Sequence, residues 1–176
     1  MPSLKLQPRE GPVGTEIKLI GTGFRPNVSY RIEFDGQWLK PGTTNNRGSF
    51  VTVFRVPPAP YGENNIIGVS QAAHQLAHAT FKVLPEITRV EPAMLKPAET
   101  VTVSGTGFGR EEALEICVND RPVVFPSPVH ARADGTFVAS FTVTDEMISS
   151  TPIIIRVTGQ QTGALAQTVL GQMNLR

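Results

Sequence analysis

The sequence predicts an all-β fold made of two tandem two-sheet sandwiches joined by a short linker. First, one pattern of about 85 residues occurs twice within the 176-residue chain. Second, apolar residues recur mainly at every second position, which is typical of strands that are buried on one face. Third, Gly, Pro, Asn and Asp signals separate about seven such segments in each copy, and that spacing favours a sandwich.

The repeat consists of two pairs of similar segments. They are "GPVGTEIKLIGTGF" (11–24) with "LKPAETVTVSGTGF" (95–108), and "GSFVTVFRV" (48–56) with "GTFVASFTV" (135–143). Both pairs occur in the same order, so we expect one domain over 1–84 and a second over 85–176. Pro85 lies in the very short junction between them and should make the joint stiff.

The segment "YRIEFDGQWLK" (30–40) predicts a β-hairpin. Its apolar and polar residues alternate up to Asp35-Gly36, a turn signal in which both positions take positive φ. The turn sets three pairs opposite one another: Phe34 with Gln37, Glu33 with Trp38, and Ile32 with Leu39. Leu39 then joins the inner face, and Trp38 points outward.

The second copy repeats this hairpin around Asn119-Asp120. Val123 should lie opposite Ile116, and Cys117 should share the outer face with Pro122. In the next strand of each copy, one face carries the core residues, which are Phe50, Thr52, Phe54 and Val56 in the first copy, and Phe137, Ala139, Phe141 and Val143 in the second.

The remaining strands form one further hairpin in each copy. We expect 65–70 to pair with 78–83, and 152–157 with 165–171. The segment "SQAAHQLAHA" (70–79) has some helical spacing, but its counterpart "TGQQTGALAQ" is turn-like, so both are interpreted as hairpins.

The pattern "EPAMLKPAETVTVSGTGF" resembles the opening of IPT/TIG domains, which are immunoglobulin-like folds common in bacterial surface proteins. "GPVGTEIKLIGTGF" is similar to the same opening. The resemblance covers nearly the whole chain and implies two immunoglobulin-like sandwiches. Members of the family serve as adhesive spacers, modules of larger enzymes, and parts of receptors or phage virions. The resemblance implies no catalytic residues.

The repeated G-T-G-F block could be read as a phosphate loop, but the sequence favours a structural role. A phosphate loop leads from a strand into a helix, whereas "FGREEALEICVND" (108–120) contains two adjacent glutamates and then alternates like a strand. We expect the glycines to permit a tight bend, with Phe24 or Phe108 closing the end of its sandwich.

Other candidate chemistry is also better explained by structure. His74 and His78 have the spacing of metal ligands on a helix, yet they lie in a predicted hairpin. Asp35, Asp120, Asp134 and Asn45-Asn46 each fall in a separate predicted turn, so no calcium site is expected. Cys117 lies within a strand beside Glu115, which favours an inert thiol over a nucleophile. We therefore predict no enzyme activity, no metal and no cofactor.

Trp38 and Tyr61 are the candidate binding residues. Trp38 is the single tryptophan and is predicted to face outward, and Tyr61 lies in the proline-rich turn "PPAPYGEN" (57–64). Exposed aromatic side chains can stack on sugars or anchor a protein partner. The alternative is that Trp38 covers the sandwich edge or packs on the other domain.

The function predicted from sequence is a non-enzymatic structural or adhesive module that decorates or assembles into a larger surface structure, such as a phage virion. The alternative is a carbohydrate-binding or cell-surface adhesion module of a bacterial exported protein. Partners would be proteins of a capsid, tail or cell surface, or glycans. The net charge of +1 opposes nucleic-acid binding, and no apolar run is long enough for a membrane span.

Two features concern location and assembly. The start "MPSLKLQPREGP" has no apolar core of a signal peptide, so we expect a virion or cytosolic protein, or a piece of a longer exported one. The stretch "TVLGQMNLR" (168–176) continues past the expected last strand and is a predicted docking tail, because open strand edges can accept a further strand.

Overall fold

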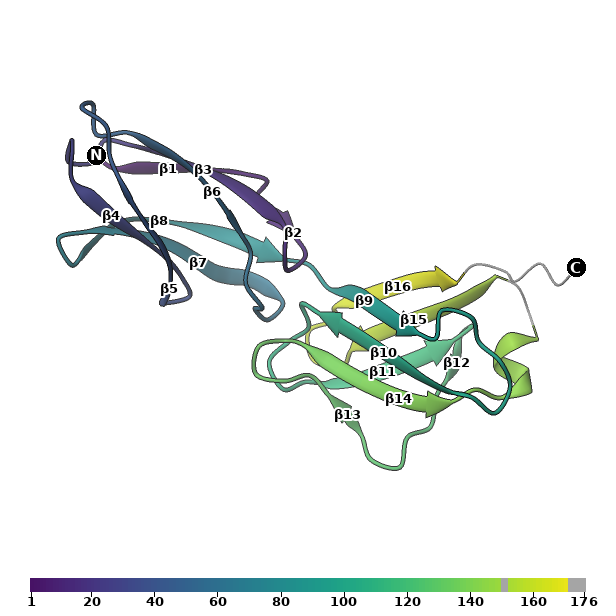
Figure 1. Cartoon of the computed structure of the whole chain (residues 1–176). Helices are drawn as coiled ribbons and strands as arrows, with labels where there is room; N and C mark the ends of the chain where they lie inside the picture. The colour runs from purple at the N-terminus through teal and green to yellow at the C-terminus, as the bar shows by residue number, and fades with distance from the viewer. Residues whose placement is uncertain (150–151, 171–176) are drawn as a thin grey trace, which may run out of the picture. The chain divides into compact units, whose positions relative to one another are not determined.

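The computed structural model describes residues 1–149 and 152–170, and the chain divides into two compact units. The first unit comprises Met1–Pro57 and Gly62–Val83, and the second comprises Pro58–Tyr61 and Leu84–Arg176. Nearly all regular structure is β-strand, as Figure 1 shows. The one helical element described is a four-residue 3-10 turn, η1 (Asp145–Ile148). The predicted all-β class is therefore confirmed.

The first unit is a sandwich of a three-stranded and a five-stranded sheet. The three-stranded sheet has the order β1-β3-β6, with strands β1 (Ser3–Gln7), β3 (Glu16–Thr22) and β6 (Phe50–Arg55). The five-stranded sheet has the order β2-β8-β7-β4-β5, with strands β2 (Glu10–Gly11), β8 (His74–Val83), β7 (Gly62–Gln71), β4 (Ser29–Phe34) and β5 (Gln37–Thr43). The ring of Tyr30 on β4 stacks on Phe50 of β6 at 4.1 Å between centroids, which joins the two sheets through the core.

The second unit has the same two-sheet plan. Its three-stranded sheet has the order β14-β10-β9, with strands β14 (Phe137–Thr142), β10 (Thr100–Thr106) and β9 (Glu86–Glu91). The other sheet has the order β12-β11-β15-β16, and β13 (Val129–His130) also pairs with β11; its strands are β12 (Arg121–Pro122), β11 (Ala113–Val118), β15 (Ile153–Gly159) and β16 (Leu165–Leu170). One apolar core draws residues from both sheets.

The alternating faces follow the predicted pattern. Phe50, Thr52, Phe54 and Val56 are buried while the residues between them are exposed, and Phe137, Ala139, Phe141 and Val143 behave in the same way. The predicted late hairpins are also present, as β7 with β8 and β15 with β16. Gly171, predicted to end the last strand, lies outside the described residues.

One predicted register in the first hairpin is wrong. Glu33 pairs with Trp38 as expected, but Ile32 pairs with Lys40 rather than with Leu39, because a bulge adds one residue to β5. A bulge bends its strand and increases the local twist. Leu39 is consequently only half-buried.

The repeated G-T-G-F block forms the bend that was predicted. Gly23 and Gly107 both have φ of +78°, a left-handed conformation that favours glycine. The following phenylalanines are buried, and Phe108 packs edge-on against Phe137 with centroids 5.3 Å apart. The next element is strand β11 and not a helix, so the block lacks the helix N-terminus that a phosphate loop requires.

Candidate functional site

The β4–β5 hairpin presents Trp38 on the outer face of the five-stranded sheet. Asp35 and Gly36 have φ of 51° and 79°, the pair of left-handed residues that a two-residue hairpin turn needs. The turn sets Trp38 directly opposite Glu33, so their Cβ atoms lie about 5 Å apart on one face. The Trp38 residue is 51% exposed, which confirms the predicted outward orientation.

The pairing continues in one row across the sheet. Glu33 of β4 lies opposite Gly68 of β7, and Gly68 lies opposite His78 of β8. Residues that are directly opposite share a face, so Trp38, Glu33 and His78 all point outward along this row. Gly68 contributes no side chain, and the row is therefore lowest at its centre.

A shallow hollow of about 380 Å³ occupies this low part of the sheet. Its lining includes Glu33, Asp35, Ile66, Gly68, Gln75 and His78. The Gln75 side chain lies over Gly68, because a Cβ added to Gly68 would be 2.8 Å from the Gln75 Nε2 atom. An amide, an imidazole and a carboxylate thus surround Gly68, and the amide extends over it.

The two carboxylates at the hollow have different roles. Asp35 is a structural acceptor, since its Oδ1 accepts the Ile66 N–H at 2.7 Å and its Oδ2 accepts the Asn65 Nδ2–H at 2.8 Å. Glu33 makes no hydrogen bond or ion pair within residues 1–149 and 152–170. Its carboxylate is therefore available to accept hydrogen bonds from a ligand.

Chemically, this face combines one exposed aromatic plane with several hydrogen-bonding groups. The indole of Trp38 offers an apolar surface with one N–H donor. Glu33 accepts hydrogen bonds, Gln75 both donates and accepts them, and His78 offers two ring nitrogens. Such a set suits a neutral ligand that is apolar on one face and rich in hydroxyls at its edge.

Tyr61 is less exposed than the sequence suggested for a binding aromatic residue. It belongs to the second unit, where it is partly buried and packs on the apolar core. Its backbone N–H donates to the Phe108 carbonyl oxygen at 2.8 Å. Trp38 lies in the first unit, so the two predicted site residues belong to separate units.

The two hairpin histidines take different positions in the β7–β8 hairpin. His74 lies opposite Gln71, which points inward, whereas His78 lies opposite Gly68 on the outer face. The pairing of β7 with β8 shifts register between Val69 and Ser70. Because this shift lies between His74 and His78, the two histidines do not share one face as residues four apart in a regular strand would. The described part of the chain holds no group of three or more His, Cys, Asp or Glu residues that could hold a metal ion.

Of the predicted turn residues, Asp134 and Asn45 bond within their own turns, whereas Asp35 bonds to β7 and Asp120 pairs with Arg156 of β15 at 2.7 Å. The Asp134 Oδ1 accepts hydrogen bonds from the Thr136 N–H and hydroxyl, and the hydroxyl bond is the main reason that the pKa of Asp134 is lowered. The Asn45 Oδ1 accepts the N–H groups of Arg47 and Ser49. These contacts agree with the turn interpretation.

Cys117 is a poor nucleophile. It faces Pro122 as predicted, but it is only 7% exposed rather than open on the outer face, with Arg156 opposite it on β15. Burial, together with a hydrogen bond that Sγ donates to Glu115 at 3.3 Å, raises its pKa to about 11. A thiolate is thus disfavoured near neutral pH.

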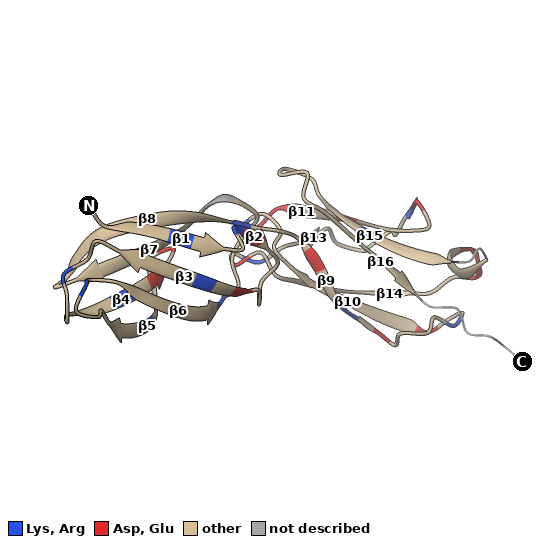
Figure 2. Cartoon of the chain, turned by 90° about the horizontal axis from the view of Figure 1, so that it is seen from above, with Lys and Arg blue, Asp and Glu red and all other residues tan. Residues whose placement is uncertain are grey.

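Charge is mixed over the surface. Figure 2 shows Lys and Arg interspersed with Asp and Glu in both units, and neither sign covers a face in that view. A nucleic-acid interface needs clustered positive charge, so this distribution agrees with the near-neutral net charge. None of the helical structure in the described residues is long and apolar enough to cross a membrane.

Sequence reasoning identified Trp38 as a candidate binding residue and placed Glu33 opposite it. It considered His78 only as a possible metal ligand, and it missed Gly68 and Gln75. The turn signal fixes the first pair within a single hairpin. The other three enter the site through the pairing of β4 with β7 and β8, which lie more than 30 residues away in the chain. The sequence did contain one indication of this site. Ile67 and Val69 alternate as core residues of β7, so Gly68 between them should face outward and leave a position without a side chain.

Comparisons with known proteins give many similar solved structures. No family model matches the chain, and no curated protein matches it. The chain is similar to SGBP-B from a complex xyloglucan utilization locus in Bacteroides uniformis, with 18% sequence identity and a TM-score of 0.38. The match covers 96% of this chain and 47% of that chain, so this chain spans about half of its length.

Proposed function

We propose that this chain is a non-enzymatic glycan-binding module that uses the outer face of its first unit. The observation that carries the proposal is the row Trp38–Glu33–Gly68–His78. A pyranose ring laid on the indole would place its C–H groups against an apolar plane and its hydroxyls toward Glu33 on the adjacent strand. Because β8 lies three strand spacings from β5, about 14 Å, a further sugar of an oligosaccharide would contact Gln75 and His78.

The charge of the hollow favours a neutral sugar over a phosphorylated ligand. Two carboxylates, those of Glu33 and Asp35, line it, and neither lysine nor arginine does. A phosphate would be repelled by these carboxylates, while neutral hydroxyls can donate to Glu33.

The state of Asp35 favours binding over hydrolysis. Glycoside hydrolysis canonically requires two carboxyl groups, one as acid and the other as base or nucleophile. Both oxygens of Asp35 already accept hydrogen bonds from Asn65 and Ile66, which leaves Glu33 as the one carboxylate available at the hollow.

The test uses Trp38 as its own reporter, since it is the single tryptophan. The purified chain is screened on a glycan array, and each hit is titrated as a soluble oligosaccharide while tryptophan emission is recorded. We expect emission to shift with saturation. We expect Trp38→Ala to abolish array binding. Glu33→Gln should weaken binding at least about tenfold, through the loss of roughly one hydrogen bond. Gly68→Ala should weaken it to a similar extent, because the added Cβ would displace the Gln75 amide.

Matched controls separate the site from general surface effects. Val51→Ala removes an apolar side chain that is 62% exposed on the other sheet and should leave binding unchanged. Tyr61→Ala should lower the stability of the second unit without changing affinity. If no glycan on the array binds in a Trp38-dependent manner while circular dichroism shows a folded protein, the proposal is wrong.

The setting that we propose for this activity is a cell surface, where a sugar-binding face meets glycans. Decoration of a virion, the first prediction from sequence, stays a prediction with its own test. If the purified chain neither forms nor joins a stable multimer or particle, a virion role is excluded.

A further inference from the structure

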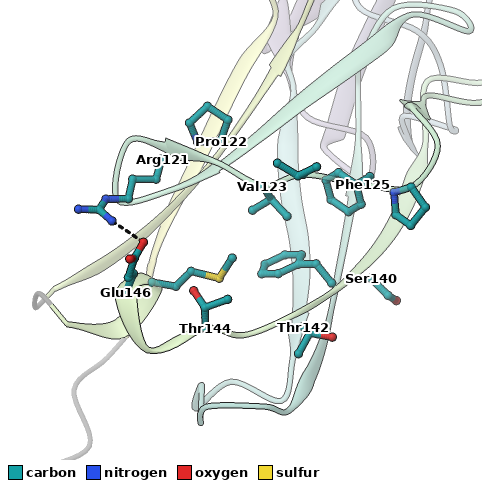
Figure 3. A pocket seen from close by; sticks show the side chains of 12 residues that line it. Arg121, Pro122, Val123, Phe125, Ser140, Thr142, Thr144 and Glu146 are labelled. Carbon is teal, nitrogen blue, oxygen red and sulfur yellow. Dashed lines mark hydrogen bonds and ion pairs between the residues drawn. The ribbon is translucent and has the colours of Figure 1, made fainter.

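A second surface feature lies in the second unit, at the edge of its sandwich. A cleft of about 560 Å³ runs between strand β14 and the segment 121–126. Figure 3 shows Val123 and Phe125 on one side of it, Thr142 and Thr144 on the other, and Arg121 paired with Glu146 across one end. Phe141 and Met147 add to its apolar lining.

Strand β14 borders this cleft with unused backbone groups. In the described residues it pairs with β10 alone. The Val143 N–H donates to the Glu99 carbonyl, and the Val143 carbonyl accepts the Ala98 N–H, so the backbone of Val143 faces β10. Because these directions alternate along a strand, the N–H and C=O groups of Ser140 and Thr142 face away from β10, toward the cleft that both residues line.

The first unit closes the equivalent edge and the second does not. In the first unit, the Lys40 Nζ donates to the Val53 carbonyl oxygen at 3.0 Å, and lysine is a common protector of edge strands. In the second copy of the repeat, Ser140 corresponds to Val53. Val124 corresponds to Lys40, because each lies at the same position after the first residue of its hairpin turn, Asn119 or Asp35. Val124 cannot donate and is 91% exposed. In addition, β5 has seven residues whereas β12 has two.

We propose that this edge accepts residues 171–176 of a second copy of the chain as an added strand. The segment reads Gly-Gln-Met-Asn-Leu-Arg, so Met173 and Leu175 alternate with polar residues. An added strand would bond to the backbone of Ser140 and Thr142 and place both apolar side chains in the cleft. Of the docking tail predicted over 168–176, residues 168–170 belong to β16, and residues 171–176 lie outside the described residues.

The position of β16 is the reason that the donor is a second copy. β16 and β12 are at opposite ends of the order β12-β11-β15-β16, three strand spacings apart, or about 14 Å. Six extended residues span at most about 20 Å. A segment that leaves Leu170 would use most of its length to cross the sheet and could not then run along β14. Donation from copy to copy is a heterologous contact, which gives rings or open chains.

The test measures association of the full chain by sedimentation velocity over a range of concentrations. We expect concentration-dependent oligomers that disappear on deletion of 171–176 and on Leu175→Asp. Val124→Lys, which restores the lysine of the first unit, should weaken association at least tenfold. Val138→Lys is the matched control, since Val138 is 51% exposed on the same strand but does not line the cleft, and it should have no effect.

A labelled peptide of residues 170–176 provides the second measurement, by fluorescence anisotropy. It should bind the variant that lacks 171–176, and Val124→Lys in that variant should reduce the affinity at least tenfold. A monomeric full chain whose truncated form nevertheless binds the peptide would show docking within one chain and overturn the second-copy proposal. A monomeric full chain with no peptide binding, or equal effects of Val124→Lys and Val138→Lys, would overturn the edge site itself.

Discussion

Thr162 holds the buried carboxylate of Glu112 through two hydrogen bonds. The Thr162 N–H donates to Oε2 and its hydroxyl donates to Oε1, each at 2.9 Å. The Gly109 N–H supplies a third bond to Oε1 at 2.8 Å. These bonds tie the loop after the second G-T-G-F block to the β15–β16 turn. Glu112 is 1% exposed, so its carboxylate depends on these donors in place of water.

Glu112→Gln should destabilise the chain by about 2 kcal/mol. The amide keeps the shape of the carboxylate but turns one acceptor into a donor that faces another donor, and an unsatisfied buried donor costs about 1–3 kcal/mol. The measurement is urea unfolding followed by far-UV circular dichroism. Glu111→Gln, at an exposed neighbour, is the control and should change stability by less than about 0.5 kcal/mol. Equal effects of the two variants would contradict this account.

Gly107→Ala should cost more stability than Gly163→Ala. Both glycines have positive φ, +78° and +74°, so both variants carry the left-handed penalty of about 1–2 kcal/mol. A Cβ on Gly107 would also overlap the Leu84 carbonyl, whereas a Cβ on Gly163 meets nothing within 4 Å. Thermal unfolding by circular dichroism should therefore show a larger fall in midpoint for Gly107→Ala. The same fall for both variants would mean that crowding at Leu84 is unimportant.

The β7–β8 turn contains residues that can be replaced to stabilise the first unit. Ala72 and Ala73 have φ of 50° and 63°, which alanine adopts at a cost. The double change Ala72→Asn with Ala73→Gly matches the preference of this turn type and should stabilise the first unit by about 1–2 kcal/mol. Urea unfolding followed by Trp38 emission reports this unit alone, since the second unit has no tryptophan. Ala77→Gly, within strand β8, should instead lower the stability of the first unit. A gain in stability from this variant as well would show that glycine stabilises the unit regardless of the turn.

Cys117 should react slowly with thiol reagents in the folded chain. With a pKa of about 11 rather than 9.0, about one thiol in a thousand is ionised at pH 8 instead of about one in ten. Labelling by iodoacetamide should rise with pH up to about 11 and become fast on unfolding. Glu115→Gln removes a charge that raises this pKa and should increase the rate at pH 8, while Glu111→Gln should not. Labelling of the folded chain at the rate of a free cysteine would show that the thiol is not protected.

Local sequence signals predicted much of the fold. The turn signal Asp35-Gly36 and the alternation before it gave the Glu33–Trp38 pair, because a two-residue turn fixes the register next to it. The same signals predicted the wrong partner for Leu39, the next residue after Trp38. A bulge depends on how the strand must bend over the core, and no local residue preference specifies it.

The candidate site shows the same division. Trp38 was identified from its outward parity, which is a property of one strand. Tyr61 was identified from its type and its proline-rich surroundings, yet packing on the core of the second unit decides its exposure. Gly68, Gln75 and His78 join Trp38 through strand pairing, which residue type alone does not reveal.

By itself, the sequence determined the all-β class, the repeated pattern, the main hairpins and the residues that face the core. These follow from alternation and turn chemistry, which act between residues close together in the chain. The tertiary structure alone decided that Glu112 is a buried tie, that Lys40 closes one sheet edge, and that Ser140 borders an open one. Such features depend on which strands become neighbours and on which polar groups burial leaves to be satisfied.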